Sequence, residues 1–417
     1  MSSAPPHRAE KAVSLARPVP ESKPLLLCLS HLRWDFVFQR PQHLMVRAAR
    51  DFDVLFVEEP LHDAAGAPWT SLSRRGDGLV VATPHLPPSL GAEAGLAAQR
   101  ALLDEALAPH AAQPMVAWFY TPMALAFASH LRPAVTVWDC MDELSAFRGA
   151  PSDMRRMEAA MLSRADIVFT GGRSLYEAKM GRHPNLHCFP SSIDTPHFAR
   201  ARANQPDPDD QVGIGRPRIG FFGVIDERMD VGLVDALAAL RPDWQLVMIG
   251  PVAKIDPAAL PRRPNIHWLG PKRYEELPSY LAGWDLGFMP FALNESTRFI
   301  SPTKTPEFLA AGLPVVSTPV FDVVRDYGEA GLVEIASGPD SFAERLAALS
   351  ARPRAAWLER VDRRLAELSW DRTWEAMRRA LPALPALAPA GRTPPPPDDA
   401  PRHAMSAPSW GGGASHV

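Results

Sequence analysis

The segment RFISPTKTPEFLAAGLPVVSTP, residues 298–319, carries a complete loop, helix and strand in 22 residues. A polar loop passes through Pro302 into a helical pattern expected at 304–311, and Gly312 follows as a C-terminal cap. Residues 314–318 then return as an apolar run. A helix that leads through a tight turn into a fully apolar strand is typical of α/β proteins, whose parallel strands are buried on both faces.

The same alternation extends in both directions from this segment. Apolar runs lie at residues 25–30, 54–57, 115–119, 134–138 and 167–170, and again at 218–223, 245–250, 265–269, 285–290 and 314–318. Between the two sets, PDPDDQVGIGRP at 206–217 has the Pro, Gly and Asp content of an interdomain linker. The pattern predicts two doubly wound α/β domains, residues 23–205 and 218–369. Further helices are expected at 41–50, 274–282 and 370–381.

The composition is that of a folded chain of 417 residues. Hydrophobic residues make up 46% and charged residues 22%, which are ordinary values for a globular protein. The 44 basic and 47 acidic residues leave a net charge of −3, so there is no overall positive field to attract nucleic acid. Many of the 45 prolines lie near the ends, and we expect residues 1–22 and 383–417 to be disordered.

The sequence predicts a cytoplasmic location. Cys28, Cys140 and Cys188 have no metal-like spacing, and three cysteines in so long a chain argue against a disulfide framework. The first 20 residues lack the apolar core of a signal peptide, and no stretch approaches the roughly 20 apolar residues that span a bilayer.

A contact between the N-terminal domain and a membrane surface is a further hypothesis. Arg40, Arg47 and Arg50 lie near the apolar residues 36–38, as in helices that bind a bilayer surface. The alternative is a buried amphipathic helix with a solvated basic edge.

Several familiar motifs are missing from the sequence. There is no G-x-x-x-x-G-K-[ST], no G-x-S-x-G and no C-x-x-C, and the pair Gly213 and Gly215 precedes a strand instead of following one. These absences argue against a P-loop kinase and a nicotinamide dehydrogenase. His183 and His187 are four residues apart, but Pro184 breaks any helix that would align them, so no metal site is predicted.

The loop and helix at 298–319 have the features of an anion site. Arg298 and Lys304 bring two cations to the start of the helix, where free N–H groups and the helix dipole also favour negative charge. Ser301 lies in the loop, and Glu307 lies one turn into the helix, where it could accept hydrogen bonds from a ribose diol. These residues predict a nucleoside diphosphate site. The alternative is that Glu307 only complements the helix dipole and that Arg298 is a surface residue.

A family resemblance rests on segments distributed over nearly all of residues 25–381. They are SHLRWDFVFQRPQHLM (30–45), LFVEEP (55–60), WDCMDELSAF (138–147), SRADIVFTGGRSLYEAK (163–179), FPSSIDTPHF (189–198), FFGVIDERMD (221–230), VMIGP (247–251) and SPTKTPEFLAAGLPVVSTP (301–319). In these segments the chain resembles the retaining glycosyltransferases that use nucleotide sugars, of the family 4 type, with two facing Rossmann-like domains in the GT-B architecture. Within them it is similar to a bacterial subgroup often encoded beside UDP-galactopyranose mutase.

This resemblance implies that the C-terminal domain binds the donor. Glu307 matches the residue that binds the ribose, and the backbone of Thr303 and Lys304 matches the diphosphate cradle. Arg228 is the only cation in the loop 223–228, which normally supplies a basic residue to the phosphates. The segment 270–274, with Lys272 and Arg273, corresponds to the part that meets the base. Two positions depart from the family: Phe299 replaces an acidic residue that contacts the sugar, and residues 39–43 replace a Gly-Gly loop.

The N-terminal domain is implied to hold the acceptor. Asp139 and Asp142 follow the apolar run at 134–138, at the edge where α/β sheets bind ligands. His31, Arg40 and His43 lie on the adjacent loop and helix. The family often has a catalytic His or Asp here, although Asp139 could also cap a turn and His31 could be a satisfied loop residue. The resemblance also places a final helix, 370–382, back against the N-terminal domain.

The sequence therefore predicts a metal-independent, retaining glycosyltransferase of polysaccharide biosynthesis, without a cofactor. Its donor would be a nucleotide diphosphate sugar with UDP as the favoured nucleotide, and its acceptor a glycan or a lipid-linked glycan. Two alternatives remain open. One is a nucleotide-sugar 2-epimerase on the same fold, and the other is a non-catalytic protein that binds sugar nucleotides.

Overall fold

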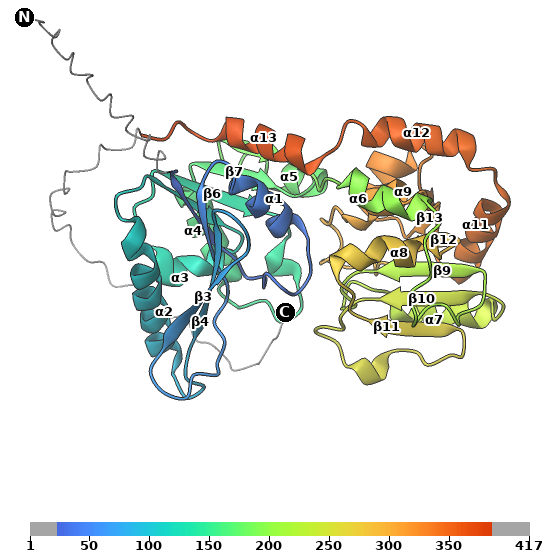
Figure 1. Ribbon diagram of the computed structural model, residues 1–417, viewed down its shortest axis with the longest axis horizontal. Helices are drawn as coiled ribbons and strands as arrows, with labels where there is room; N and C mark the ends of the chain where they lie inside the picture. The colour runs from blue at the N-terminus through green and yellow to red at the C-terminus, as the bar shows by residue number, and fades with distance from the viewer. Residues whose placement is uncertain (1–22, 386–417) are drawn as a thin grey trace, which may run out of the picture.

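Two α/β domains lie side by side in the computed structural model, which describes residues 23–385 (Figure 1). The N-terminal domain contains an eight-stranded sheet and the C-terminal domain a six-stranded sheet. This confirms the predicted pair of doubly wound domains. The predicted disordered ends lie outside the described residues except for 383–385, which have no regular secondary structure.

The N-terminal sheet has the strand order β3-β4-β2-β1-β5-β6-β7-β8, and only the edge strand β3 is antiparallel to its neighbour. The strands are β1 (Leu25–Leu29), β2 (Asp53–Val57), β3 (Trp69–Arg74), β4 (Leu79–His85), β5 (Met115–Phe119), β6 (Val135–Cys140), β7 (Ile167–Thr170) and β8 (Leu186–Cys188). All five residues of β1 are buried because alternate side chains enter two separate cores, one on each face. Burial on both faces is why the strand is an uninterrupted apolar run.

Helices cover both faces of this sheet. They are α1 (Arg40–Ala48), α2 (Ala92–Leu107), α3 (Leu125–Ala128), α4 (Met154–Arg164) and α5 (Arg173–Lys179). The first of them starts at Arg40 and ends at Ala48, slightly earlier than the 41–50 that the sequence predicted. Pro41 occupies its first turn, where the missing N–H is not needed.

The C-terminal sheet is parallel throughout, in the order β11-β10-β9-β12-β13-β14. Its strands are β9 (Arg218–Phe222), β10 (Gln245–Ile249), β11 (Ile266–Gly270), β12 (Leu286–Met289), β13 (Val315–Ser317) and β14 (Glu334–Ile335). Its helices include α7 (Val231–Leu240), α8 (Leu277–Ala282), α9 (Lys304–Ala310), α10 (Phe321–Val323), α11 (Pro339–Ala351) and α12 (Ala355–Leu365). The helix expected at 274–282 begins as a 3-10 turn, Tyr274–Glu276, before α8.

The chain enters the C-terminal domain earlier than the sequence indicated. Helix α6 (Thr195–Ala199) precedes the predicted linker, yet its Phe198 is fully buried in the C-terminal core with Ile193 and Phe308. The linker is itself packed, since the Gln211 side chain bonds the Tyr280 carbonyl and accepts a hydrogen bond from Trp284. Residues 193–205 therefore belong to the C-terminal core and not to the N-terminal domain.

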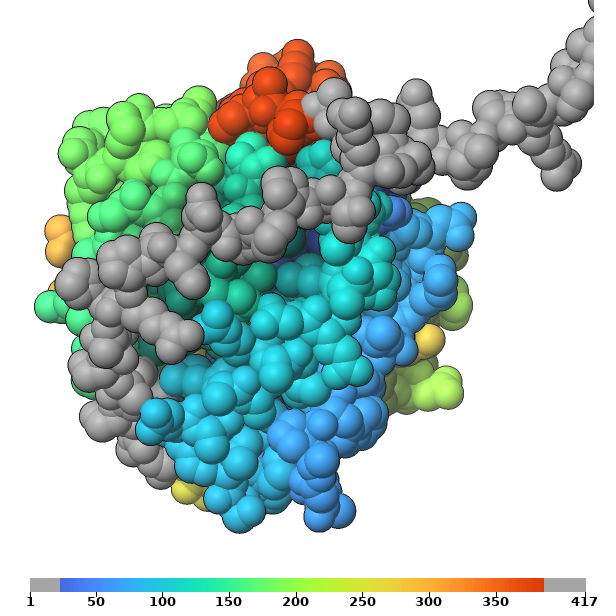
Figure 2. Space-filling model, turned by 90° about the vertical axis from the view of Figure 1, so that its left-hand side faces the viewer, coloured from blue at the N-terminus to red at the C-terminus, as the bar shows by residue number. Residues whose placement is uncertain are grey.

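Helix α13 (Trp370–Ala380) returns to the N-terminal domain, as predicted (Figure 2). Trp370, Trp374 and Met377 are buried in the same core as β1 and α1. The Trp374 indole donates a 2.8 Å hydrogen bond to Asp51, and Asp371 pairs with arginines of the α1 region. The last helix is thus a structural part of the first domain.

We predict that Trp374→Ala lowers the free energy of unfolding of the N-terminal domain by about 3–5 kcal/mol, because it leaves a cavity in the core and removes the hydrogen bond to Asp51. Urea unfolding followed by far-UV circular dichroism would measure it. Arg379→Ala, on the exposed face of the same helix, is the control and should leave the transition unchanged. A Trp374→Ala protein as stable as wild type would show that α13 is only loosely attached.

Candidate active site

A small cavity of about 100 Å³ lies between the two domains. The N-terminal domain contributes Arg40, Met141, Asp142 and Ser191, and the C-terminal domain contributes Gly223, Arg228 and the stretch from Ile300 to Lys304, among others. Both walls are built at the carboxyl ends of parallel strands, which is where α/β sheets bind ligands. We refer to this space as the cleft.

Lys304 reaches the cleft because two glycines let neighbouring loops approach. Gly223 has φ +142°, and a Cβ atom there would lie 2.8 Å from Cε of Lys304. Gly250 has φ +146°, and a Cβ atom there would overlap the carbonyl oxygen of Gly223. The pKa of Lys304 is lowered by burial, which Glu307 partly offsets. In the described part of the chain its ammonium group forms no ion pair and bonds only the Thr303 hydroxyl, at 3.2 Å.

Arg228 also lines the cleft, but its charge is already matched. Its guanidinium forms hydrogen bonds of 2.6–3.0 Å to the nearly buried carboxylate of Asp226. Burial alone would lower the pKa of Arg228, and the bonds to Asp226 raise it above the ordinary value. The Arg228–Asp226 pair therefore offers directed N–H donors but little net charge.

Glu307 is a buried carboxylate with an unfilled bonding position. It lies one turn into α9, is 7% exposed, and its Oε2 has no hydrogen-bond partner among the described residues. Burial raises its pKa from 4.5 to about 7, although Lys304 acts in the opposite direction. A buried acceptor without a partner costs free energy, so the site is suited to a ligand hydroxyl that would supply the missing bond.

The two aspartates after β6 have different environments. Asp142 lines the cleft, and burial raises its pKa to about 6, against the opposing effect of Arg228. Asp139 is 0% exposed and accepts three hydrogen bonds of 2.8–3.1 Å from Arg40, which also donates to the Phe189 carbonyl. The catalytic prediction for Asp139 is therefore corrected: its carboxylate is occupied by Arg40 and does not face the cleft.

His31 lies on the loop after β1, near the opposite domain. Burial, followed by the positive charge of Lys254 from the C-terminal domain, lowers its pKa to about 4, so the imidazole is neutral at pH 7. Its Nδ1 is buried and has no partner among residues 23–385. His31 is therefore an uncharged group beside the cleft.

Other predicted residues lie outside the cleft. Lys272 forms a 2.6 Å ion pair with Asp210, and the side chain of Arg273 is 78% exposed beside Glu276. Arg298 is exposed over the ring of Phe299, in contrast to Ser301 and Thr303, which line the cleft.

His43 and the arginines of the first helix have structural positions. The His43 ring stacks on Trp370 of α13 at 4.7 Å, so it joins two helices, and it is not among the residues that line the cleft. Arg40 is buried, and Arg47 is paired with Asp371. The proposed basic membrane surface is therefore not formed, because only Arg50 of the three arginines is well exposed.

Two cleft-side residues were missed by the sequence analysis. Lys254 is the only non-glycine residue with positive φ in the described chain, at +59°, and its Nζ lies 5.0 Å from the ring centre of Phe147. The Arg228 guanidinium lies 5.5 Å from the same ring. Phe147 follows β6, so one aromatic ring of the N-terminal domain contacts two cations of the other domain. Nothing in the sequence marked Lys254, because its position depends on backbone conformation.

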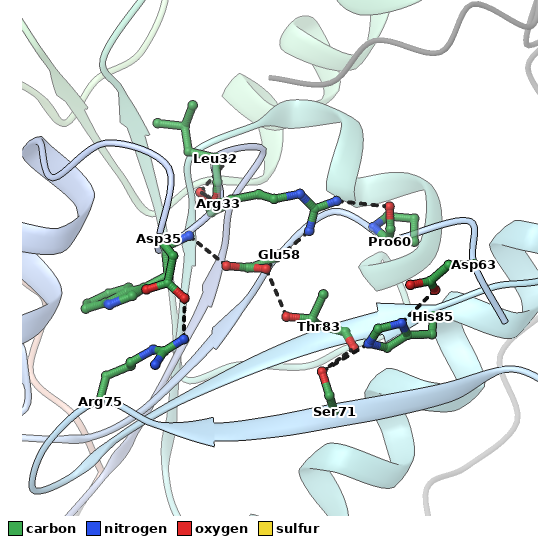
Figure 3. Close-up of polar contacts among 12 residues, drawn as sticks. Leu32, Arg33, Asp35, Glu58, Pro60, Asp63, Ser71, Arg75, Thr83 and His85 are labelled. Carbon is green, nitrogen blue, oxygen red and sulfur yellow. Dashed lines mark hydrogen bonds and ion pairs between the residues drawn. The ribbon is translucent and has the colours of Figure 1, made fainter. Parts of the chain in front are cut away.

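A polar network supports the loop that carries His31 (Figure 3). The Glu58 carboxylate accepts hydrogen bonds from the Trp34 backbone at 2.6 Å, from Arg33 at 3.2 Å and from the Thr83 hydroxyl at 2.9 Å. These bonds join the loop after β1 to the ends of β2 and β4. The network therefore holds in place the loop after β1, whose Val37 and Gln39 line the cleft.

A second part of the network includes Ser71, His85 and Asp63 (Figure 3). His85 lies 2.7 Å from Asp63 and 3.1 Å from Ser71, and the ring of Trp69 stacks on it. The order of the three polar groups is that of a hydrolase triad, but the Ser71 hydroxyl donates to the Thr83 carbonyl. This group therefore fastens the β3–β4 hairpin.

No group of three or more His, Cys, Asp or Glu side chains with metal-binding geometry occurs within residues 23–385. Over the same range, none of the helices combines the length and the apolar character needed to cross a bilayer.

We predict that Asp139→Ala lowers the free energy of unfolding by about 3–5 kcal/mol, because Arg40 is left as a buried unpaired charge. The double variant Arg40→Met, Asp139→Leu should recover most of this loss, since no charge then remains buried. Asp153→Ala, which removes an exposed ion pair, should leave the melting temperature unchanged. Chemical denaturation of wild type and the three variants would measure these differences. An Asp139→Ala protein as stable as wild type would contradict the structural role of the ion pair.

The comparisons with known proteins agree with this geometry. Residues 216–352 match the family model described as glycosyl transferases group 1. The putative teichuronic acid biosynthesis glycosyltransferase TuaH of Bacillus subtilis (strain 168) is 30% identical over 238 residues, 52% of this chain and 59% of the relative. The match thus covers less than two thirds of that protein.

Solved structures extend the likeness to both domains. Sucrose-phosphate synthase from Thermosynechococcus elongatus has a TM-score of 0.64 at 14% identity, over 86% of this chain and 98% of that one. A UDP-forming alpha,alpha-trehalose-phosphate synthase from Burkholderia xenovorans has 0.61 at 13%, over 86% and 98%. The chain therefore has the GT-B fold, and its residues 216–352 are similar to the glycosyl transferases of group 1.

Proposed function

We propose that this chain is a retaining glycosyltransferase that transfers a sugar from UDP-sugar to a glycan or lipid-linked acceptor. The observation that carries the proposal is the cleft, in which Lys304 and Arg228 of one domain face Asp142 of the other. The group 1 match covers the domain with the two cations, and the teichuronic acid relative points to glycan synthesis. Membership in family 4, in the subgroup named above, is part of the same proposal.

On the donor side, the proposal gives each group a separate task. Lys304, which has no ion pair within residues 23–385, would neutralise the diphosphate, and Arg228 would direct N–H donors at its oxygens. Lys254 is a second cation without an ion pair in that range. Glu307 would accept hydrogen bonds from the ribose diol through its unpartnered oxygen.

The reaction would proceed on one face of the sugar through an oxocarbenium-like state. The bond from the sugar to the diphosphate breaks as the acceptor oxygen bonds to the same carbon, and the leaving phosphate takes the acceptor proton. Stabilising negative charge on that phosphate is then the main catalytic effect. We propose that Lys304, Lys254 and Arg228 supply this stabilisation without a metal ion, and that Asp142 stabilises positive charge on the sugar.

The proposed setting is the cytoplasm. All three cysteines are free in the structure, and a reducing compartment would keep them so. We propose no peripheral membrane contact through the first helix, because Arg40 and Arg47 are held in ion pairs.

Turnover of a panel of UDP-sugars, with and without glycan acceptors, tests the function. Release of UDP that requires an acceptor and keeps the anomeric configuration is the expected result. Conversion of the donor without an acceptor would favour the 2-epimerase, and binding of UDP without any turnover would favour a non-catalytic protein.

We predict that Lys304→Ala weakens UDP binding by about 1.5–3 kcal/mol, or roughly 10- to 150-fold, because a charge-assisted contact is lost. Isothermal titration calorimetry would measure the Kd. Lys272→Ala is the matched control, because Lys272 lies outside the cleft on Asp210. Equal effects of the two substitutions on the Kd for UDP would show that Lys304 does not belong to the donor site.

We predict that Glu307→Gln stabilises the ligand-free protein at high pH while weakening UDP binding. The pKa of Glu307 is about 7 when folded and 4.5 ordinarily, so the folded state binds the proton more tightly. Its contribution to stability is therefore lost as the pH rises from about 4.5 to about 7. Glutamine cannot ionise, so the variant should melt above wild type at pH 8 and equal to it at pH 4.5.

Thermal melts at the two pH values would measure this effect. Glu329→Gln, at an exposed position, serves as the control and should match wild type at both. A Glu307→Gln protein that melts below wild type at pH 8 would identify Glu307 as a structural helix residue.

A further inference from the structure

A second and larger space, of about 490 Å³, opens between the domains beside the cleft. We call it the side cavity. One wall includes Glu143 and Ser145, which directly follow Asp142, and residues of α4 and α5. The other wall comes from the C-terminal domain, with Glu295 and Phe299. The side cavity therefore adjoins the cleft through the loop that carries Asp142, and its volume exceeds that of the cleft.

The charges around the side cavity balance. The three cations Arg155, Lys179 and Arg182 face the three carboxylates Glu143, Glu158 and Glu295. Much of this wall is already organised, since the Lys179 side chain is 1% exposed and holds Glu143 at 2.5 Å and Glu158 at 2.8 Å. A neutral lining gives neither an anion nor a cation a net attraction, and so many polar groups exclude a lipid tail.

Two lining side chains are unengaged. Arg155 and Glu295 form no hydrogen bond or ion pair within the described residues, although each lines the side cavity, one from each domain. One offers five N–H donors and the other only acceptor oxygens. A ligand that satisfies both must carry groups that donate as well as accept, and hydroxyl groups do this.

Phe299 supplies the aromatic surface of the side cavity. Its half-buried ring packs against the N-terminal core, and the Arg298 guanidinium lies over it at 5.2 Å from the ring centre. The C–H faces of a sugar ring pack on aromatic rings, while its hydroxyl groups bond carboxylates and guanidinium groups at the ring edge. Phe299 together with Arg155 and Glu295 provides both kinds of contact.

We propose that the side cavity binds a neutral sugar unit of the acceptor, with Phe299 as the stacking surface and Arg155 and Glu295 as hydrogen-bonding groups. The proposal rests on the proposed glycosyltransferase function, and it names the acceptor as an uncharged hexose within the glycan. The loop from Asp142 to Ser145 would place this unit next to the donor sugar in the cleft.

The test measures binding of methyl hexosides to the full chain with UDP present at saturation. Methyl glucosides, galactosides and mannosides are compared with methyl glucuronide and methyl glucosaminide by ligand-observed NMR. At least one neutral hexoside is expected to bind with a millimolar Kd and more tightly than both charged sugars. Phe299→Leu keeps the apolar packing but removes the ring, and Arg155→Ala removes the N–H donors. Each of these two single variants should weaken the binding of that hexoside at least fivefold.

Phe321→Leu is the matched control, because Phe321 is also a partly exposed ring beside an arginine, at 4.9 Å, but lies outside the side cavity. It should leave hexoside binding unchanged, and all three variants should bind UDP as wild type does. Unchanged hexoside affinity in Phe299→Leu and Arg155→Ala, or tighter binding of a charged sugar, would overturn the proposal. If the protein binds UDP but no hexoside, the side-cavity proposal is overturned while the proposed donor site stands. If the protein binds no UDP, the proposed function itself is refuted.

Discussion

The buried ion pair between Arg40 and Asp139 is the contact on which both the fold and the cleft depend. It joins the first residue of α1 to the end of β6, and Arg40 also bonds the carbonyl of Phe189, two residues before Ser191 of the cleft wall. Helix α1 in turn receives α13, because His43 stacks on Trp370. One guanidinium therefore joins the start of α1, the end of β6 and the segment at Phe189. Because the pair is shielded from solvent, removal of either partner would leave an uncompensated buried charge, which disfavours any arrangement that separates the two side chains.

Three ionisable groups in and beside the cleft are at least partly buried, which disfavours their charged forms. Burial raises the pKa of Asp142 and Glu307 and lowers that of Lys304, so the charged form of each group is less stable here than it would be in water. Such shifts concentrate at sites where a ligand later supplies the missing partners. The Arg228–Asp226 pair and the contacts of Phe147 with two cations hold the positive groups of the site in place.

The sequence predicted the sheets well and the cleft only in part, for a physical reason. Strands such as β1 are apolar throughout because both faces are buried, and α13 has its tryptophans on one face, so local pattern and final structure agree. The role of Asp139 was misjudged because its partner Arg40 lies 99 residues earlier. Lys254 was missed because its placement depends on a positive φ. The predicted boundary between the domains was too late in the chain because the sequence of α6 does not differ from that of the helices before it. This helix belongs to the second core only through contacts such as that of Phe198 with Phe222.

The two sides of the domain interface are built differently, which bears on how a donor could enter. At α5 the approach is close: the Ser174 N–H donates to the Asp322 carboxylate at 3.0 Å, and a Cβ atom on Gly172 would lie 2.8 Å from Cβ of Ser301. At Phe147 the domains meet through cation–π contacts at 5.0–5.5 Å. A diphosphate would compete with that ring for Arg228 and Lys254, but it could not displace the packed contact at Gly172. We therefore expect a bound diphosphate to change the contacts at Phe147 and to leave the packed contact at Gly172 intact.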